Sequence, residues 1–248
     1  MTVKELEAKL FELFPKELAA EYDNVGLLVG EGNSEIKGVV VALDCTKGAI
    51  EFAKKIGANL IVTHHPVIFQ GIKTATEGDI VFELIKGGIS CISMHTNFDS
   101  ANSGVCDALA NALGITNVTP LETNEGVIIR KGELCTPLLA DDFAKLIKQA
   151  LGGSVKYANC GKVIKTVALC SGSGSDFLCD AISCGADAYV SGEIKHHLYF
   201  EALNNNISVF DCGHYESEVI AMNVLKNAIE SIFGGKTEIY CHNEIKTL

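Results

Sequence analysis

Apolar and polar positions along the chain follow two different repeat lengths. Short, mostly apolar runs at 39–43, 59–63 and 89–94 have the length and β-branched content of buried strands. The segments between them, near 47–56 and 79–86, space apolar residues three and four apart and predict amphipathic helices. The alternation continues with strands at 126–134, 163–170, 186–191 and 207–212, and with helices near 103–113, 140–151, 176–184, 196–204 and 216–232. Strands that alternate with helices predict an α/β fold.

The chain also contains an internal sequence repeat. GANLIVTHH at 57–65 resembles GADAYVSGE at 185–193, and each segment follows a predicted strand and helix. In the same way, GISCISMHT at 88–96 resembles NISVFDCGH at 206–214. We therefore expect two similar α/β domains built on one structural repeat. Their expected bounds are 1–120 and 121–236, and a final strand within 237–248 joins the first domain or pairs with the second.

Composition narrows the function classes. Of the 248 residues 48% are hydrophobic, which is sufficient for a sizeable core, and the net charge is −11 without any run of basic residues. An acidic surface repels phosphate backbones, so direct nucleic-acid binding is not expected. No apolar stretch approaches the roughly 20 residues that span a bilayer. The first 14 residues predict an amphipathic helix and not a signal peptide, so we expect a cytoplasmic protein.

The ten cysteines do not form a metal-binding or disulfide pattern. They are scattered, several of them lie in apolar strand-like runs, and no two have CxxC spacing. Scattered cysteines in a chain of this length are typical of small, reduced core residues.

The candidate ligands share one position, because each lies just past an apolar strand. They are His64, His65, His95, Asp99, His214 and Glu218. In open α/β sheets, ligands bind beyond the carboxyl ends of the strands. Each motif alone has a structural alternative: the paired histidines as a surface pair, and Asp99 as a helix N-cap. His214 and Glu218 are spaced i, i+4 and share one helix face.

The combination favours metal binding. Three or four nitrogen ligands with two carboxylates suit zinc, iron, manganese or nickel. This set is larger than the three protein ligands of a catalytic zinc. Two divalent metal ions about 3.5–4 Å apart, bridged by one carboxylate, accommodate it.

Other polar groups leave two readings open. Glu193, His196, His197 and His95 contact substrate or move protons in one reading, and cap or pack in the other. SGSGSD at 171–176 joins a strand to a helix, and a tight turn capped by Ser175 is favoured over a phosphate cradle. The segment lacks a Walker lysine and GxGxxG spacing, so we do not expect an NTPase or a dinucleotide-binding protein.

Five motifs in this order resemble the NIF-three-like dinuclear-metal family, whose members are also called GTP cyclohydrolase 1 type 2 homologues. They are EYDNVGLLVG at 21–30, THHP at 63–66, HTNFD at 95–99, SGEIKHH at 191–197 and GHYESE at 213–218. The resemblance implies two similar α/β domains with a dinuclear metal site in the cleft between them. It also implies a toroidal homohexamer, and the short stretch between residues 117 and 160 indicates the form without an inserted domain.

The resemblance assigns the metal ligands as well. It places them at His64, His65, Asp99, His214 and Glu218, with Glu218 bridging both metals. One metal is expected on His65 and Asp99, and the other on His64 and His214.

Two functions from different classes remain open at this stage. The first is a metal-dependent hydrolase, GTP cyclohydrolase-like or phosphoesterase-like, that acts on a small nucleotide-like or anionic substrate, with Glu193 or His95 as the proton-moving group. The second is a non-catalytic protein that handles metals or uses them as a scaffold. A third possibility is an interaction protein that affects transcription, which the family's name suggests. The acidic balance and the lack of a basic patch argue against direct contact of this chain with DNA.

Overall fold

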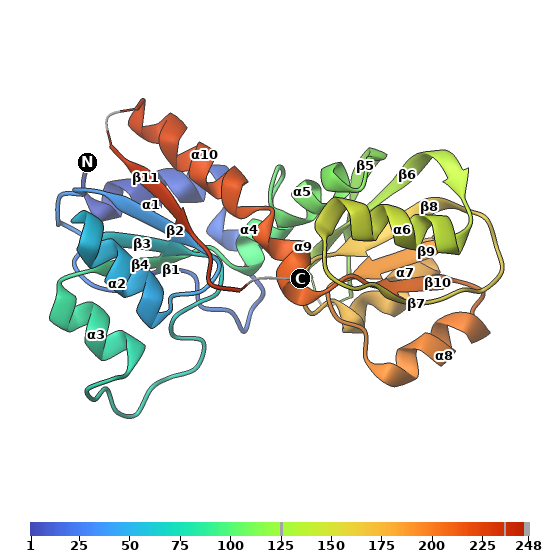
Figure 1. Ribbon diagram of the computed structural model, residues 1–248, viewed down its shortest axis with the longest axis horizontal. Coiled ribbons are helices and arrows are strands. Elements are labelled where there is room, and N and C mark those ends of the chain that lie inside the picture. Colours follow the sequence, from blue (N-terminus) through green and yellow to red (C-terminus); the bar gives the residue numbers. More distant parts are fainter. Residues whose placement is uncertain (125, 236, 246–248) are drawn as a thin grey trace. The chain divides into compact units, whose positions relative to one another are not determined.

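The computed structural model describes residues 1–124, 126–235 and 237–245. The described chain divides into two compact units. Unit 1 contains residues 1–101 together with 222–245, and unit 2 contains residues 102–221. Each unit has a single mixed β-sheet with helices packed on it (Figure 1), which confirms the expected class of two α/β domains.

Unit 1 is built on a five-stranded sheet. Its order is β1 (Gly26–Val29), β4 (Ser90–Ser93), β3 (Leu60–Thr63), β2 (Val39–Ala42) and β11 (Ile239–His242). All neighbouring strands are parallel except β1, which is antiparallel to β4. Every residue of β2, β3 and β4 is buried, which explains why these strands are continuously apolar or small in the sequence.

The helices of unit 1 form two pairs. The crossover helices α2 (Lys47–Ile56) and α3 (Ile80–Gly87) contact each other, and α1 (Val3–Leu13) contacts α10 (Met222–Phe233). Local sequence sets their ends. Thr2 and Glu5 form a capping box at the start of α1, and α2 begins at the N-cap Thr46 and ends at Gly57 in the left-handed conformation. The short elements η1 (Lys16–Leu18) and α4 (Thr96–Ser100) complete the unit.

Unit 2 is built on a six-stranded sheet. Its order is β5 (Ile115–Glu122), β6 (Ile128–Leu138), β8 (Ile164–Cys170), β9 (Ala188–Ser191), β10 (Ser208–Asp211) and β7 (Lys156–Ala158). The helical elements are α5 (Val105–Ala112), α6 (Ala140–Leu151), η2 (Ser175–Phe177), α7 (Leu178–Ser183), α8 (His196–Asn204) and α9 (His214–Val219). The buried Arg130 of β6 donates from Nε to Asp107 of α5 at 2.5 Å, so its charge is compensated inside the unit.

The two units repeat one motif. In unit 1, β2, β3 and β4 are adjacent parallel strands linked by α2 and α3. In unit 2, β8, β9 and β10 are adjacent parallel strands linked by α7 and α8. The chain leaves β3 at His64 and β9 at Gly192, and it leaves β4 just before His95 and β10 just before His214. The polar residues that follow these strands therefore occupy equivalent ends of two equivalent sheets.

The units do not have the bounds that the sequence predicts. Residues 102–120, expected in the first domain, belong to unit 2, because α5 packs on β5, β6 and β8. The helix expected at 216–232 is two helices, α9 and α10, and the second belongs to unit 1, where it contacts β11 and β2. β11 pairs in parallel with β2, which resolves the pairing of the final strand in favour of unit 1.

The cysteines differ in burial more than the sequence predicts. All ten are free thiols, and only four of them are buried: Cys91, Cys106, Cys170 and Cys212. Cys135, Cys179 and Cys241 are exposed, so the expectation of core residues is wrong for these three.

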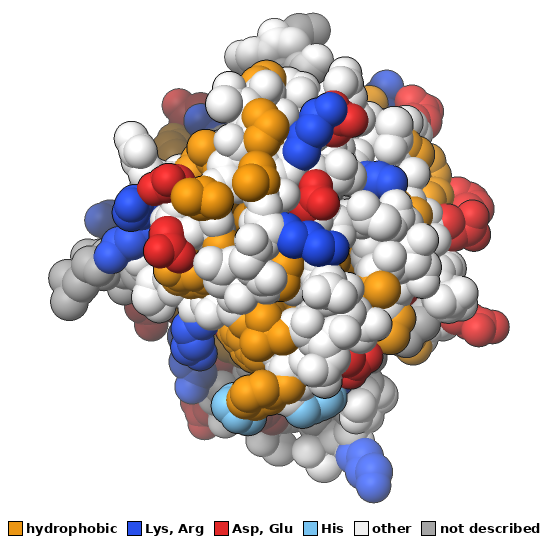
Figure 2. Space-filling view, turned by 90° about the vertical axis from the view of Figure 1, so that its right-hand side faces the viewer, with side chains coloured by type: hydrophobic (Ala, Val, Ile, Leu, Met, Phe, Trp, Pro, Cys, Tyr) orange, Lys and Arg blue, Asp and Glu red, His pale blue; other side chains and the backbone are white. Residues whose placement is uncertain are grey.

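The surface mixes charges of both signs. On the face drawn in Figure 2, acidic and basic side chains are interspersed, and hydrophobic side chains lie between them. Among the described residues, no helix has both the length and the apolar character that crossing a membrane requires.

Candidate metal-binding site

The end of β3 brings two imidazoles together in unit 1. The backbone N–H groups of His64 and His65 donate to the carbonyls of Ala42 and Leu43 at 3.3 and 3.0 Å, so both residues continue the sheet past the end of the strand. The Thr63 hydroxyl then donates to the His65 carbonyl at 2.8 Å and stabilises the turn. As a result the two ring centroids are only 5.0 Å apart, although neighbouring strand residues normally point to opposite faces.

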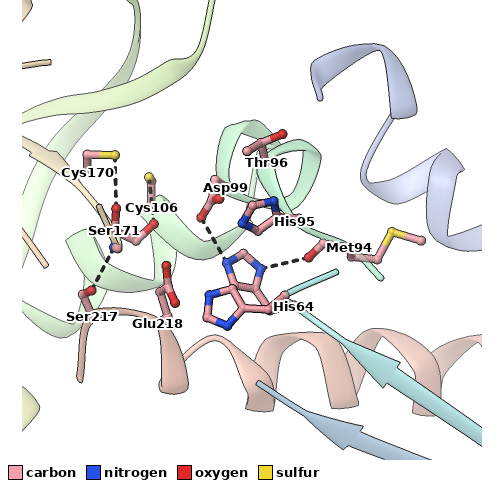
Figure 3. Close-up of polar contacts among 12 residues, drawn as sticks. His64, Met94, His95, Thr96, Asp99, Cys106, Cys170, Ser171, Ser217 and Glu218 are labelled. Atoms are coloured by element: carbon pink, nitrogen blue, oxygen red, sulfur yellow. Dashed lines mark hydrogen bonds and ion pairs between the residues drawn. The ribbon is translucent and has the colours of Figure 1, made fainter. Parts of the chain in front are cut away.

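The end of β4 adds His95 and Asp99 to the same group. The His95 ring lies 5.1 Å from the His64 ring and 5.7 Å from the His65 ring, and ring nitrogens of all three lie within 4.8 Å of one another. Asp99 is in α4, and its Oδ1 lies 3.8 Å from His64 Nε2 (Figure 3). It caps neither α4 nor α5, whose N-caps are His95 and Gly104, so the capping alternative is wrong.

Each imidazole uses its Nδ1 atom for a hydrogen bond within its own unit. His64 Nδ1 lies 2.8 Å from the Met94 carbonyl oxygen (Figure 3). The other three bonds join His65 to Asp44 at 2.8 Å, His95 to Asp23 at 2.8 Å, and His214 to Glu193 at 3.0 Å. Carbonyl and carboxylate oxygens only accept, so Nδ1 carries the proton in every ring, and Nε2 is the nitrogen that can bind a metal.

Unit 2 contributes His214 and Glu218 on one face of α9. His214 Nε2 and Glu218 Oε2 are 3.1 Å apart, and the Glu218 residue is 3% exposed. Gly172, which follows β8, is close to both side chains. A Cβ atom at Gly172 would lie 3.1 Å from Glu218 Cδ and 3.3 Å from His214 Nε2, and would overlap Glu218 Oε1. The Ser217 hydroxyl accepts from the Gly172 N–H at 3.0 Å and holds this loop in place.

These contacts shift the pKa values of His214 in unit 2 and of Asp23 in unit 1. The neighbouring Glu218 carboxylate is the largest influence on His214, and together with Glu193 it raises the pKa of His214 to about 9 against the opposing effect of burial. For Asp23, burial is the largest influence and would raise the pKa. The hydrogen bonds from His95 and Thr96 outweigh it and lower the pKa of Asp23 to about 2.

The remaining candidates have clear structural surroundings. Glu193 is exposed and accepts hydrogen bonds from His214 and from the Ser173 hydroxyl, the latter at 3.0 Å. His196 and His197 begin α8 and are exposed, and His196 packs edge-on against Phe200. Ser175 does not act as the expected cap, because its hydroxyl donates to the Glu193 carbonyl and accepts from the Lys195 N–H.

Three residues of these groups were not singled out from the sequence. Asp44 and Asp23 are the acceptors for His65 and His95, and Gly172 leaves the space that Glu218 occupies. Asp44 lies just past β2, so the rule that found the histidines could also have found it. Asp23 lies in a loop 72 positions away from its partner His95, and no spacing in the sequence connects them.

The side chains of these two groups are of the types that bind divalent transition metals. Unit 1 brings together His64, His65 and Asp99 with His95, and unit 2 brings together His214 and Glu218. Imidazole nitrogens backed by a hydrogen bond at Nδ1, together with carboxylate oxygens, are the ligand types that zinc, iron, manganese and nickel prefer.

The fold and these groups define a class: an α/β protein with two repeated units and histidine–carboxylate groups that can hold metal ions. The family model Duf34/NIF3 (NGG1p interacting factor 3) matches residues 1–247. The chain therefore belongs to the DUF34/NIF3 family, as its motifs suggest.

Known relatives agree with this assignment. A GTP cyclohydrolase 1 type 2 homolog of Clostridium perfringens is 37% identical over 218 residues, which are 84% of this chain and 83% of that protein. Among solved structures, protein SA1388 of Staphylococcus aureus is 26% identical with a TM-score of 0.91, covering 100% of this chain and 99% of that one. Reduced HcgD from Methanocaldococcus jannaschii is 29% identical with a TM-score of 0.85, covering 98% of each chain.

Proposed function

We propose that the chain is a dinuclear metal protein that hydrolyses a small nucleotide-like or anionic substrate. One observation carries the proposal: all four imidazoles of the two groups direct Nδ1 to an acceptor of the protein, so that Nε2 is the nitrogen presented for coordination. Histidines that serve only packing do not need a common tautomer, whereas metal ligands almost always have such a partner.

The proposed ligands are the five that the family resemblance assigns. His65 and Asp99 hold one metal ion, His64 and His214 hold the other, and Glu218 bridges both. The metals are divalent and are zinc, iron, manganese or nickel, because the ligands combine imidazole nitrogen with carboxylate oxygen. The short distance between His214 Nε2 and Glu218 Oε2, 3.1 Å, supports a shared role for these two ligands.

In this proposal the protein's own groups orient the substrate and move protons. Bound divalent metals supply Lewis acidity, which polarises a carbonyl or phosphoryl group and makes water a stronger acid. His95 has Nδ1 committed to Asp23, so its Nε2 is the atom that exchanges a proton. Glu193 is exposed and bonded to His214, which allows it to orient that ligand and to accept a proton from solvent.

Two further properties are part of the proposal. The homohexamer is proposed from the family resemblance, and the cytoplasmic location is proposed from the sequence alone. Light scattering coupled to size-exclusion chromatography gives the mass of the assembly, and a mass other than six chains rejects the hexamer.

Turnover before and after chelation tests the proposed activity. Purified protein is assayed on a panel of nucleotides, including GTP, and simple phosphoesters, then stripped of metal and reloaded with zinc, iron, manganese or nickel in turn. Activity that disappears on chelation and returns with one of these metals supports the hydrolase. Two tightly held metals without turnover on any substrate reject the hydrolase and support the metal-handling or scaffold alternative.

A further inference from the structure

Two exposed aromatic side chains lie beside the histidines of unit 1. Tyr22 is 63% exposed and Phe69 is 46% exposed. Their ring centroids are 6.3 Å apart at an interplanar angle of 67°, and the Phe69 ring lies 6.0 Å from the His95 ring at 89°. The three rings therefore make successive edge-to-face contacts that begin in solvent and end in the candidate metal-binding group.

Hydrogen bonds hold the two aromatic residues in this arrangement. Asn24 donates from Nδ2 to the Ile68 carbonyl at 2.6 Å, so the segments that carry Tyr22 and Phe69 are joined directly. Between Tyr22 and Asn24, the Asp23 side chain accepts from His95 at 2.8 Å and from the Thr96 N–H at 3.0 Å. The aromatic pair is thus fixed to the residue that lies next to His64 and His65.

This arrangement differs from ordinary surface exposure. A single exposed apolar side chain is normal in a folded protein and needs no explanation. Here two large rings are contiguous, both expose about half or more of their surface, and polar anchors on adjacent residues fix them beside a group of histidines. The hydrogen bonds of neighbouring residues, and not burial in the core, position the two rings. Their exposed surface is therefore available to a ligand.

We propose that Tyr22 and Phe69 form a stacking subsite for a planar aromatic or heteroaromatic ring of the substrate. The inference rests on the proposed function for the identity of the group that reacts. When the substrate ring stacks on Tyr22 and Phe69, that group lies on the side of the substrate that faces His95. Aromatic side chains take flat conjugated rings with little dependence on ring identity, because every such ring has a π-face. The subsite therefore selects substrates that carry a ring, such as a nucleobase, over those that carry only sugar and phosphate.

A pair of probes that differ only by the ring tests the subsite. Guanosine 5′-monophosphate and ribose 5-phosphate are titrated calorimetrically into metal-loaded protein, and each probe is checked to be intact afterwards. We expect the wild type to bind the nucleotide more tightly than ribose 5-phosphate. Tyr22→Ala and Phe69→Leu should each weaken nucleotide binding by about 5- to 150-fold, the range for losing one stacked base, without changing the affinity for ribose 5-phosphate.

Matched variants control for surface and folding effects. Tyr22→Phe retains the ring and should bind the nucleotide like the wild type. Phe200→Ala removes an aromatic side chain that is 57% exposed on α8 of unit 2 and should change neither affinity. Thermal unfolding and metal content, measured for every variant, should match those of the wild type.

The outcomes separate this inference from the proposed function. Equal affinity for the two probes, no binding of either, or unchanged nucleotide binding in Tyr22→Ala and Phe69→Leu overturns the subsite. Turnover that is insensitive to both substitutions rejects the subsite and keeps the hydrolase. Ring-dependent binding without turnover on any substrate keeps the subsite and rejects the hydrolase.

Discussion

Replacing Gly172 with alanine is the most informative single change in unit 2. Gly172 has φ +55°, a left-handed conformation that costs an alanine roughly 1–2 kcal/mol. The added Cβ would also overlap Glu218 Oε1 and lie 3.1 Å from Glu218 Cδ. The carboxylate is the far end of a flexible side chain, so we expect it to move while the chain still folds. Gly172→Ala should therefore separate the position of Glu218 from the integrity of the fold.

The size of both effects follows from this geometry. The backbone cost of roughly 1–2 kcal/mol corresponds to a fall of about 2–8 °C in the melting temperature of a chain of this size. Displacing the Glu218 carboxylate should weaken metal binding by about 10- to 100-fold or more. This is the range observed when groups that orient metal ligands are removed. Thermal unfolding of the metal-free protein measures the first effect, and competition with a chromogenic chelator measures the second.

Gly185→Ala is the matched control. Gly185 also has a left-handed backbone, φ +74°, in the same unit, but a Cβ there would have no atom within 4 Å. The control should lose similar stability and keep the metal affinity of the wild type. If Gly172→Ala binds metal as tightly as Gly185→Ala, then the position of Glu218 does not matter for metal binding and the reasoning is refuted.

Two other predictions concern the stability of the metal-free chain. Asp107→Ala removes the carboxylate that accepts from the buried Arg130 guanidinium and should cost about 3–5 kcal/mol in chemical denaturation, whereas Arg130→Met should cost clearly less. An equal cost for both variants would contradict this. Folding lowers the pKa of Asp23 from 3.8 to about 2, so its charged form stabilises the fold above pH 3.8, and this contribution disappears as the pH falls towards 2. Asp23→Asn should be less stable at pH 6 and lose less stability over that acid range; parallel acid unfolding curves would contradict the assignment.

The sequence predicted the strands and helices whose pattern is set locally. β2, β3 and β4 are buried on both faces and are therefore continuously apolar or small, and α2 has both a cap and a terminal glycine. The short strands β1 and β7 were missed because their three or four residues carry no periodic pattern of their own. The eight-residue strand β5 was missed as well, because most of its residues are exposed and its burial does not alternate. The break between α9 and α10 was missed because Val219 to Met222 contains neither proline nor glycine, and the break coincides with the boundary between the units.

For the candidate metal-binding groups, too, the sequence predicted what is set locally and missed what depends on long-range packing. His64, His65, His95 and His214 were found because strand ends are a fixed place in an α/β sheet. Their acceptors depend on long-range packing: Asp23 and Asp44 come from other segments of unit 1, and hydrogen-bond geometry alone pairs them with His95 and His65. Sequence patterns place side chains along a strand or helix, but they do not determine which loops meet.

Metal content of the Glu218→Gln variant tests the central claim most directly. Glutamine keeps the size of the side chain and removes its charge, and Glu216→Gln on the same helix α9 is the matched control. After saturation and desalting, we expect two metal ions per chain for the wild type and for Glu216→Gln, and at most one for Glu218→Gln with an unchanged circular dichroism spectrum. Two metal ions held by folded Glu218→Gln with the affinity of the wild type would contradict the proposed centre.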